Sequence, residues 1–154
     1  MSQTDFKLAA LGLTLPAAAA PVANYVGYTV SGKTVYISGQ LPFQDGKLTC
    51  VGKLGAGVSL DEGYAAGRQC GLNILAQMKA ACGGDLDRVA RVLRLGGFVN
   101  STPDFTDAPK CVNGASDLMV AVFGEAGRHA RAAVSVAALP AGAAIEVDAI
   151  VELK

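Results

Sequence analysis

Residues 128–153 have the sequence RHARAAVSVAALPAGAAIEVDAIVEL, and the fold that we expect follows from this segment. Residues 130–138 are small or β-branched, which is typical of a closely packed strand. Residues 139–142, Leu-Pro-Ala-Gly, have the chemistry of a turn. From residue 145 on, apolar residues alternate with mostly acidic ones, which predicts a strand with one buried face. We therefore expect two strands joined by a short turn, as in a hairpin.

Arg131 is the exception within the first of these strands. A guanidinium among Ala, Val and Ser is costly to bury unless it stays hydrated or pairs with an anion. One interpretation is a salt bridge across the hairpin to Glu146 or Asp148. The other is that Arg131 binds an anionic ligand in a pocket.

The composition indicates one domain that associates with itself. A chain of 154 residues can bury a full hydrophobic core. Hydrophobic residues make up 51% of the chain and charged residues only 17%, whereas about a quarter is usual for charged residues. We interpret the shortfall as apolar surface that is covered by other copies, and we predict a homo-oligomer.

Charge and cysteine content argue against two classes of function. The chain has 13 basic and 13 acidic residues, and nucleic-acid binding depends on a basic surface. The three arginines at 88, 91 and 94 are interpreted as a solvated sheet edge or helix-packing partners, with a local RNA patch as the alternative. Four cysteines without a CxxC pair and a single His predict no zinc site. Free thiols are typical of a reducing cytoplasm.

The N-terminus imitates a secretory signal. Residues 8–20, LAALGLTLPAAAA, have an apolar run followed by small residues. However, Lys7 is the only positive charge before the run, Asp5 precedes it, and Pro16 interrupts it. The run is also too short to span a membrane as a helix. We expect a short helix over residues 4–12, an extended segment after it, and a cytoplasmic protein without membrane contact.

The remaining elements follow from start and stop signals. Ser59 and Glu62 form a capping box that predicts the start of a long helix, and Gly83-Gly84 predicts its end. The other expected elements are strands over 25–30 and 34–38, a strand over 87–99, a loop over 100–106 and a helix over 107–123 with Asp107 as candidate cap.

This order of elements predicts a layered α+β fold. Right-handed helix crossovers between strands put both helices on one face of the sheet. The other face is then left bare and must be covered by another subunit.

Four segments of the chain resemble the RidA/YjgF family, whose members are often labelled endoribonuclease L-PSP. They are PVANY at 21–25, SGQLP at 38–42, FVNSTPDF at 98–105, and ARAAVSVAALP with IEVDAI at 130–140 and 145–150. The resemblance covers nearly the whole chain from about residue 20, so residues 1–20 form an extension of a single domain, 1–154. It implies a chorismate-mutase-like α+β fold, with two helices on one face of a mixed sheet, and a trimer whose sheets face a central core.

The resemblance also implies an activity. The active members hydrolyse enamines and imines such as 2-aminoacrylate to 2-oxo acids and ammonia in clefts between subunits, without a metal or nucleotide. The partners implied are a small carboxylate-bearing imine or 2-oxo acid and two further copies of the chain. Arg131 matches the Arg that binds the substrate carboxylate, and Glu146 matches the carboxylate that orients water. The resemblance assigns substrate binding to Tyr25, Ser38, Gly39 and Ala133.

Two departures from the family pattern keep a second function open. Ala133 replaces a Cys that often follows two residues after the Arg, although the family uses the backbone N–H there. Pro103 replaces an Asn in the loop after the third strand, which removes an amide and a backbone donor. The alternative is a non-catalytic protein that binds a small carboxylate.

Endoribonuclease or translation-inhibitor activity is the third candidate. The chain has no pair of His residues for acid–base cleavage of RNA and no net positive charge. We expect His129 to point to the opposite face of the strand from Arg131, with a structural or interface role.

Overall fold

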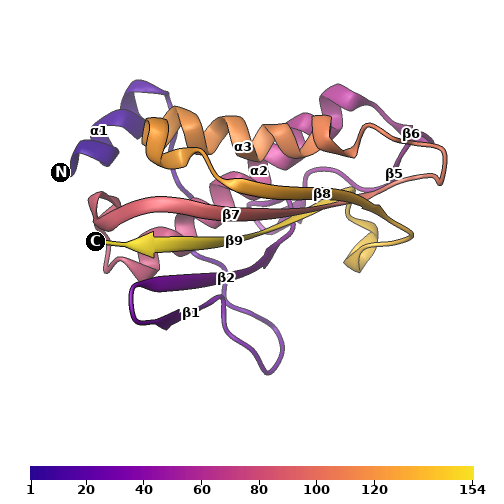
Figure 1. The fold of residues 1–154 in the computed structure, drawn as a ribbon. Helices are drawn as coiled ribbons and strands as arrows, with labels where there is room; N and C mark the ends of the chain where they lie inside the picture. Colours follow the sequence, from indigo (N-terminus) through magenta and orange to yellow (C-terminus); the bar gives the residue numbers. More distant parts are fainter.

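A computed structural model describes residues 1–154 and has two layers, a five-stranded mixed sheet and the helices that cover one of its faces (Figure 1). The strand order is β1-β2-β9-β7-β8. Only β7 and β8 run parallel, and the other neighbours are antiparallel. The strands of this sheet are β1 (Tyr28–Ser31), β2 (Thr34–Gln40), β7 (Val89–Asn100), β8 (Ala130–Val136) and β9 (Ile145–Leu153).

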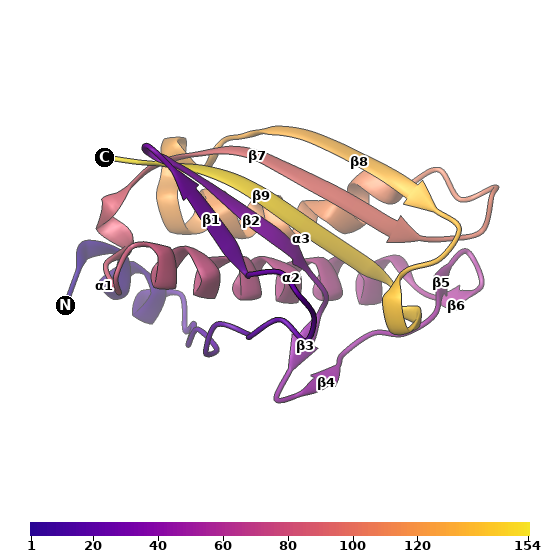
Figure 2. The same cartoon turned by 90° about the horizontal axis from the view of Figure 1, so that it is seen from below.

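The helices lie together on one side of the sheet, and α2 runs beside α3 in both views (Figures 1 and 2). None of the helices has the combination of length and hydropathy that a membrane span requires. The helices are α1 (Gln3–Ala10), α2 (Leu60–Ala81) and α3 (Ala108–Phe123), with 3-10 turns at Leu86–Arg88, Gly124–Gly127 and Pro140–Gly142. Four short strands complete the chain: β3 (Phe43–Gln44), β4 (Lys47–Leu48), β5 (Lys53–Leu54) and β6 (Gly57–Val58).

The predicted pairing of the last two strands was wrong. Strand β7 lies between β8 and β9, so these two are not a hairpin. The crossover through α3 brings β8 parallel to one edge of β7, and the 3-10 turn at Pro140–Gly142 then lets β9 pair antiparallel with the other edge. The salt bridge from Arg131 across the hairpin, one of the two interpretations of this residue, therefore does not form. Asp148 instead lies 3.6 Å from Arg94 Nη1.

The helix signals located the helices correctly. The Ser59 hydroxyl accepts from the backbone N–H of Glu62 at 3.1 Å, and the Glu62 carboxylate accepts from the N–H of Ser59 at 3.4 Å. Gly83 and Gly84 follow the helix with φ of 66° and 98°, a region that favours glycine. Asp107 is the N-cap residue of α3, but its side chain makes no capping hydrogen bond.

Helices α2 and α3 pack with their backbones almost in contact. A Cβ atom on Gly114 of α3 would lie 2.0 Å from the carbonyl oxygen of Tyr64. A Cβ atom on Gly67 of α2 would lie 2.3 Å from the carbonyl oxygen of Cys111. Because backbone atoms cannot move aside as a side chain can, this packing requires glycine at both positions.

The N-terminal helix is fixed to the body of the protein. Ser2 and Asp5 form a capping box at its start. The Asp87 carboxylate accepts hydrogen bonds of 2.8 Å from the backbone N–H groups of both Gln3 and Thr4. The predicted short helix is therefore present, and its first turn is held by a residue from the 3-10 turn before β7.

The two faces of the sheet differ, as the alternation in β9 predicted. Residues 145, 147, 149, 151 and 153 are at most 7% exposed and face the helices. The residues between them are half-buried on the other face, which no element covers (Figure 1). Tyr36 and Val134 lie on the same open face, because Tyr36 pairs with Ile150 and Val134 pairs with Phe98, the partner of Glu146. The two side chains are 49% and 46% exposed.

Candidate functional site

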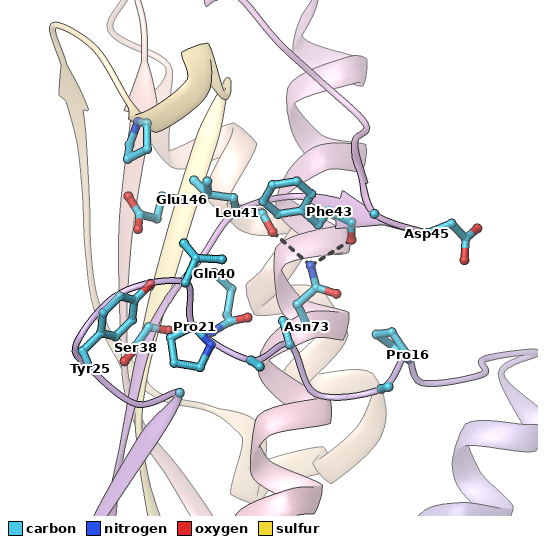
Figure 3. A pocket seen from close by; sticks show the side chains of 18 residues that line it. Pro16, Pro21, Tyr25, Ser38, Gln40, Leu41, Phe43, Asp45, Asn73 and Glu146 are labelled. Atoms are coloured by element: carbon cyan, nitrogen blue, oxygen red, sulfur yellow. Dashed lines mark hydrogen bonds between the residues drawn. The ribbon is translucent and has the colours of Figure 1, made fainter.

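A pocket of about 550 Å³ lies between the end of β2, the start of β9 and the N-terminal segment (Figure 3). Four of the six predicted site residues line it: Tyr25, Ser38, Gly39 and Glu146. They come from three separate parts of the chain. The sequence motifs therefore identified one wall of a real cavity.

A bulge in β2 gives the pocket its shape. The pairing of β2 with β9 shifts register between Ile37 and Gln40, which frees the intervening residues from the regular ladder. There the Ser38 hydroxyl donates to the carbonyl oxygen of Val26 at 2.6 Å. This contact ties the bulge to the segment that carries Tyr25, a residue that is 55% exposed and lines the pocket.

Gly39 makes room for the carboxylate of Glu146. A Cβ atom at position 39 would lie 2.3 Å from Glu146 Oε1, so any side chain there would displace the carboxylate. Glu146 belongs to none of the ion pairs of the chain. Burial raises the pKa of its carboxyl above the ordinary value of 4.5, and the neighbouring Asp148 raises it further. A half-buried, unpaired carboxyl with a raised pKa is suited to accept and return a proton.

Arg131 lies on the other side of the sheet. It pairs with Leu95 of β7, whereas Glu146 pairs with Phe98, three positions further along the same strand. An odd separation along a strand places two side chains on opposite faces. One chain therefore does not bring Arg131 and Glu146 together, and neither Arg131 nor Ala133 lines the pocket.

Helix α3 holds the Arg131 guanidinium. Its Nη1 atom donates to Asn113 Oδ1 at 2.7 Å and to Ser116 Oγ at 3.1 Å. The residue is exposed, and no hydrogen bond within the chain uses its other nitrogens. The guanidinium thus keeps donors free for an anion. Sequence reasoning missed Asn113 and Ser116, although their spacing of three on a helix places them on one face.

The expected orientation of His129 was wrong. Its Nε2 atom lies 2.9 Å from Ser116 Oγ, so His129 and Arg131 contact the same serine. Residues two apart in a strand point to the same face, and the expectation miscounted this separation. His129 Nδ1 donates to the carbonyl oxygen of Gly127 at 2.7 Å, which leaves Nε2 to accept from the Ser116 hydroxyl.

Two buried amides in the lining of the pocket were not predicted. The Asn73 side chain donates to the carbonyl oxygens of Leu41 and Phe43 at 2.9 and 3.0 Å (Figure 3). The Gln40 side chain donates to the carbonyl oxygen of Ser38 at 3.0 Å. These amides hold the strand end that forms the pocket wall. An Asn within the apolar stripe of an expected helix is the signal that could have pointed to them.

Metal binding and thiol chemistry have less support from the structure. No three His, Cys, Asp or Glu side chains gather closely enough to hold a metal ion. All four cysteines are free, and burial raises the pKa of each thiol. Pro103 lies in the loop after β7 and does not line the pocket.

Comparisons with known proteins agree with this architecture. Residues 5–153 match the family described as "YjgF/chorismate mutase-like, putative endoribonuclease". Protein TCP17 of Trypanosoma cruzi is 58% identical over 144 residues, which cover 93% of this chain and 89% of that protein. The crystal structure of Atu1372 from Agrobacterium tumefaciens, described as having unknown function, has a TM-score of 0.92 at 48% identity, with coverage of 98% and 92%. That of a "putative endoribonuclease" from Shewanella oneidensis has a TM-score of 0.93 at 41% identity, with coverage of 97% and 99%.

These matches define a class of protein, small α+β proteins of the YjgF-like fold. The chain belongs to the YjgF/chorismate mutase-like family, which confirms the resemblance to RidA/YjgF proteins and the predicted fold.

Proposed function

We propose that this protein hydrolyses imines and enamines derived from amino acids, such as 2-aminoacrylate, to 2-oxo acids and ammonia. The observation that carries the proposal is the unpaired, half-buried carboxyl of Glu146, which Gly39 admits to a pocket. Membership of the YjgF family supports it, because the active members that this sequence resembles perform this reaction.

Glu146 acts as general base and then as general acid. It removes a proton from water while the water oxygen adds to the imine carbon, and the C=N bond becomes a C–N single bond. That proton passes to the nitrogen and gives a tetrahedral carbinolamine with one hydroxyl and one amino group. Glu146 then takes the hydroxyl proton and delivers it to the amino nitrogen, the C–N bond breaks, ammonia leaves with the C–N electron pair, and the electron pair of the former O–H bond forms the carbonyl of the 2-oxo acid. An enamine first takes up a proton at carbon and loses one from nitrogen, which gives the imine. Burial raises the pKa of the Glu146 carboxyl, which suits both steps because its carboxylate accepts a proton more readily than an ordinary one.

Arg131 binds the substrate carboxylate from a second copy of the chain. A planar guanidinium pairs bidentately with a carboxylate and fixes its orientation. Because Arg131 and Glu146 lie on opposite faces of one sheet, the complete site requires two chains. A homotrimer that covers the open sheet face meets this requirement and also covers Tyr36 and Val134.

The test follows imine loss directly. An amino-acid oxidase or a pyridoxal-phosphate dehydratase generates imines in the presence of semicarbazide, which traps what is not hydrolysed. We expect the wild type to lower the yield of semicarbazone and Arg131→Ala to leave it near the level without protein. If the wild type competes with the trap for no imine, the proposal is wrong.

A second candidate is a protein that binds a small carboxylate without turnover, and Pro103 and Ala133 favour it because both depart from the active pattern. It predicts that calorimetry detects binding of pyruvate by the wild type and not by Arg131→Ala, with no hydrolysis of any imine.

RNA cleavage has less support. His129 is engaged with Ser116 and Gly127, and Arg91 Nη2 donates to the carbonyl oxygen of Arg128.

A further inference from the structure

We propose that residues 16–22, called here the N-terminal wall, select imino acids with large apolar side chains. The proposal rests on the proposed function, because it names the substrate class of the same pocket. Six of the residues that line the pocket belong to this wall, and all six are Pro, Ala or Val. Leu41, just after β2, and Phe43 of β3 add further apolar lining.

The pocket has a polar end and an apolar end. Figure 3 shows Glu146, Tyr25 and Ser38 on one side, with Pro21 beside them. Phe43, Pro16 and Asp45 lie further away on the other side, where the Asp45 carboxylate points away from the other labelled side chains. The Asn73 amide between them is already bonded to two backbone carbonyls. A substrate whose imine carbon lies near Glu146 therefore extends its side chain along surface that offers few polar partners.

The volume of the pocket exceeds what the smallest substrate needs. About 550 Å³ lies within the range of roughly 300–1,000 Å³ that is typical of pockets for drug-sized ligands. The side chain of 2-aminoacrylate is a single methylene. The pocket of one chain is therefore large enough for a substrate with a branched or aromatic side chain.

The wall is fixed in position. Gln77 of α2 donates to the carbonyl oxygen of Ala19 at 2.9 Å, in the middle of the wall. Upstream, α1 is held by Asp87, and Lys79 of α2 pairs with Asp5 at 2.9 Å. The Lys79 hydrogen bond is the main cause that lowers the pKa of Asp5 to about 2. A surface that is already ordered needs little further ordering when a ligand binds, so its shape can discriminate between substrate side chains.

An apolar lining makes kcat/KM depend on the size of the substrate side chain. Each methylene that fits such a pocket is worth on the order of tenfold in kcat/KM. The proposal therefore predicts that imines from leucine, methionine and phenylalanine are hydrolysed at least tenfold more efficiently than the imine from alanine. An amino-acid oxidase with broad specificity supplies the series, and competition with semicarbazide gives kcat/KM for each imine.

Two matched variants assign the selectivity to the wall. Ala20 lines the pocket, whereas Ala18 is exposed in the same segment and does not line it. Ala20→Asp places a charge beside the apolar side chain, and we expect the leucine-to-alanine ratio of kcat/KM to fall at least tenfold. Ala18→Asp adds the same charge and is expected to leave the ratio unchanged. A flat profile of the wild type across the imine series, or equal ratios in the two variants, overturns the proposal.

A binding experiment tests side-chain selection by the N-terminal wall separately from imine hydrolysis. If no imine is hydrolysed, calorimetry compares 4-methyl-2-oxopentanoate with pyruvate, which share the carboxylate and differ in the side chain. Tighter binding of the larger acid supports selection by the N-terminal wall even if no imine is hydrolysed. This preference must be lost in Ala20→Asp and kept in Ala18→Asp. Equal affinity of the two acids, or no binding of either, rejects it.

Discussion

The two faces of the sheet differ in how far a single chain covers them. On the covered face, the alternate residues of β9 are buried under α2 and α3, and the packing is complete within one chain. On the open face, Glu146 and Asp148 stand half-buried, and large side chains such as Tyr36 remain exposed. One chain therefore suffices for the fold, whereas the proposed chemistry needs a second chain.

Glycines show the same contrast. Gly114 on the covered side has a backbone carbonyl oxygen 2.0 Å from where its Cβ would lie, and that neighbour cannot move. Gly39 beside the open face has the Glu146 carboxylate at 2.3 Å, the end of a flexible side chain. A side chain at the first position disturbs the fold, and one at the second disturbs only the site.

The largest effect is expected for Arg131→Ala. Loss of a charge-assisted bidentate contact with the substrate lowers kcat/KM for imine hydrolysis by about 100- to 1,000-fold. Because the side chain is exposed, the free energy of unfolding changes by less than about 0.5 kcal/mol. Semicarbazide competition and urea denaturation measure the two quantities. A stability loss as large as the activity loss would contradict the role assigned to Arg131.

Mixed oligomers test whether two chains share one site. Arg131→Ala and Glu146→Gln are each expected to be inactive alone. Coexpressed in equal amounts, the two variants are expected to form mixed oligomers in which about a quarter of the sites combine an intact Arg131 from one chain with an intact Glu146 from its neighbour. We expect about that fraction of wild-type activity. Absence of any recovery, with mixed assembly verified by two affinity tags, would show that the residues do not act across chains.

Gly114→Ala is expected to lower the free energy of unfolding by about 3 kcal/mol, because an added methyl group forces the backbones of α2 and α3 apart. The measurement is chemical denaturation of the variant beside Gly124→Ala as a control. A Cβ atom on Gly124 would have no neighbour within 4 Å, although the φ of 62° at this residue adds local strain. Equal losses in the two variants would mean that the helix contact is not the cause.

Gly39→Ala is expected to lower kcat at least tenfold by displacing the Glu146 carboxylate, at a stability change below about 1 kcal/mol. Gly32→Ala serves as the control for activity, because its turn lies outside the pocket and a Cβ atom there would have no neighbour within 4 Å. Full activity of Gly39→Ala would argue against Glu146 as the proton carrier.

The smallest effect concerns pH. Since burial raises the folded-state pKa of Glu146 above its ordinary 4.5, the folded state binds this proton more tightly than the unfolded state. Wild-type stability therefore includes a contribution that is present below pH 4.5 and is lost as the pH rises through the raised pKa. Glu146→Gln lacks this loss, so its stability relative to wild type increases across that window. Urea denaturation from about pH 4 to about pH 8 measures the difference, and a difference independent of pH would contradict the assignment.

Local patterns predicted most of the elements. The Ser59 and Glu62 capping box located the start of α2, and the alternation in β9 correctly placed Glu146 on the open face. The pairing of β8 with β9 was mispredicted because a short connection favours neighbours. The pairing depends instead on the α3 crossover, which joins β8 to β7 and leaves β9 the other edge.

The candidate site was predictable only in part. Motifs identified Glu146 and the β2 segment around Gly39 because both lie in short, characteristic stretches. The N-terminal wall has no periodic pattern, and only its last two residues, Pro21 and Val22, belong to a family motif, which did not place them against a pocket. Its position depends on Gln77 and Asp87, which are distant in sequence and hold the N-terminal segment only in the folded chain.

The contact between α2 and α3 also supplies a chemical reporter. Cys111 Sγ would lie 2.7 Å from a Cβ atom on Gly63, and burial is the main cause that raises its pKa to about 11. A maleimide or disulfide reagent therefore reacts with Cys111 only when the helices separate, while the half-buried Cys50 is accessible earlier. Comparing the two labelling rates reports how often the helix layer opens in the native protein, with no engineered cysteine.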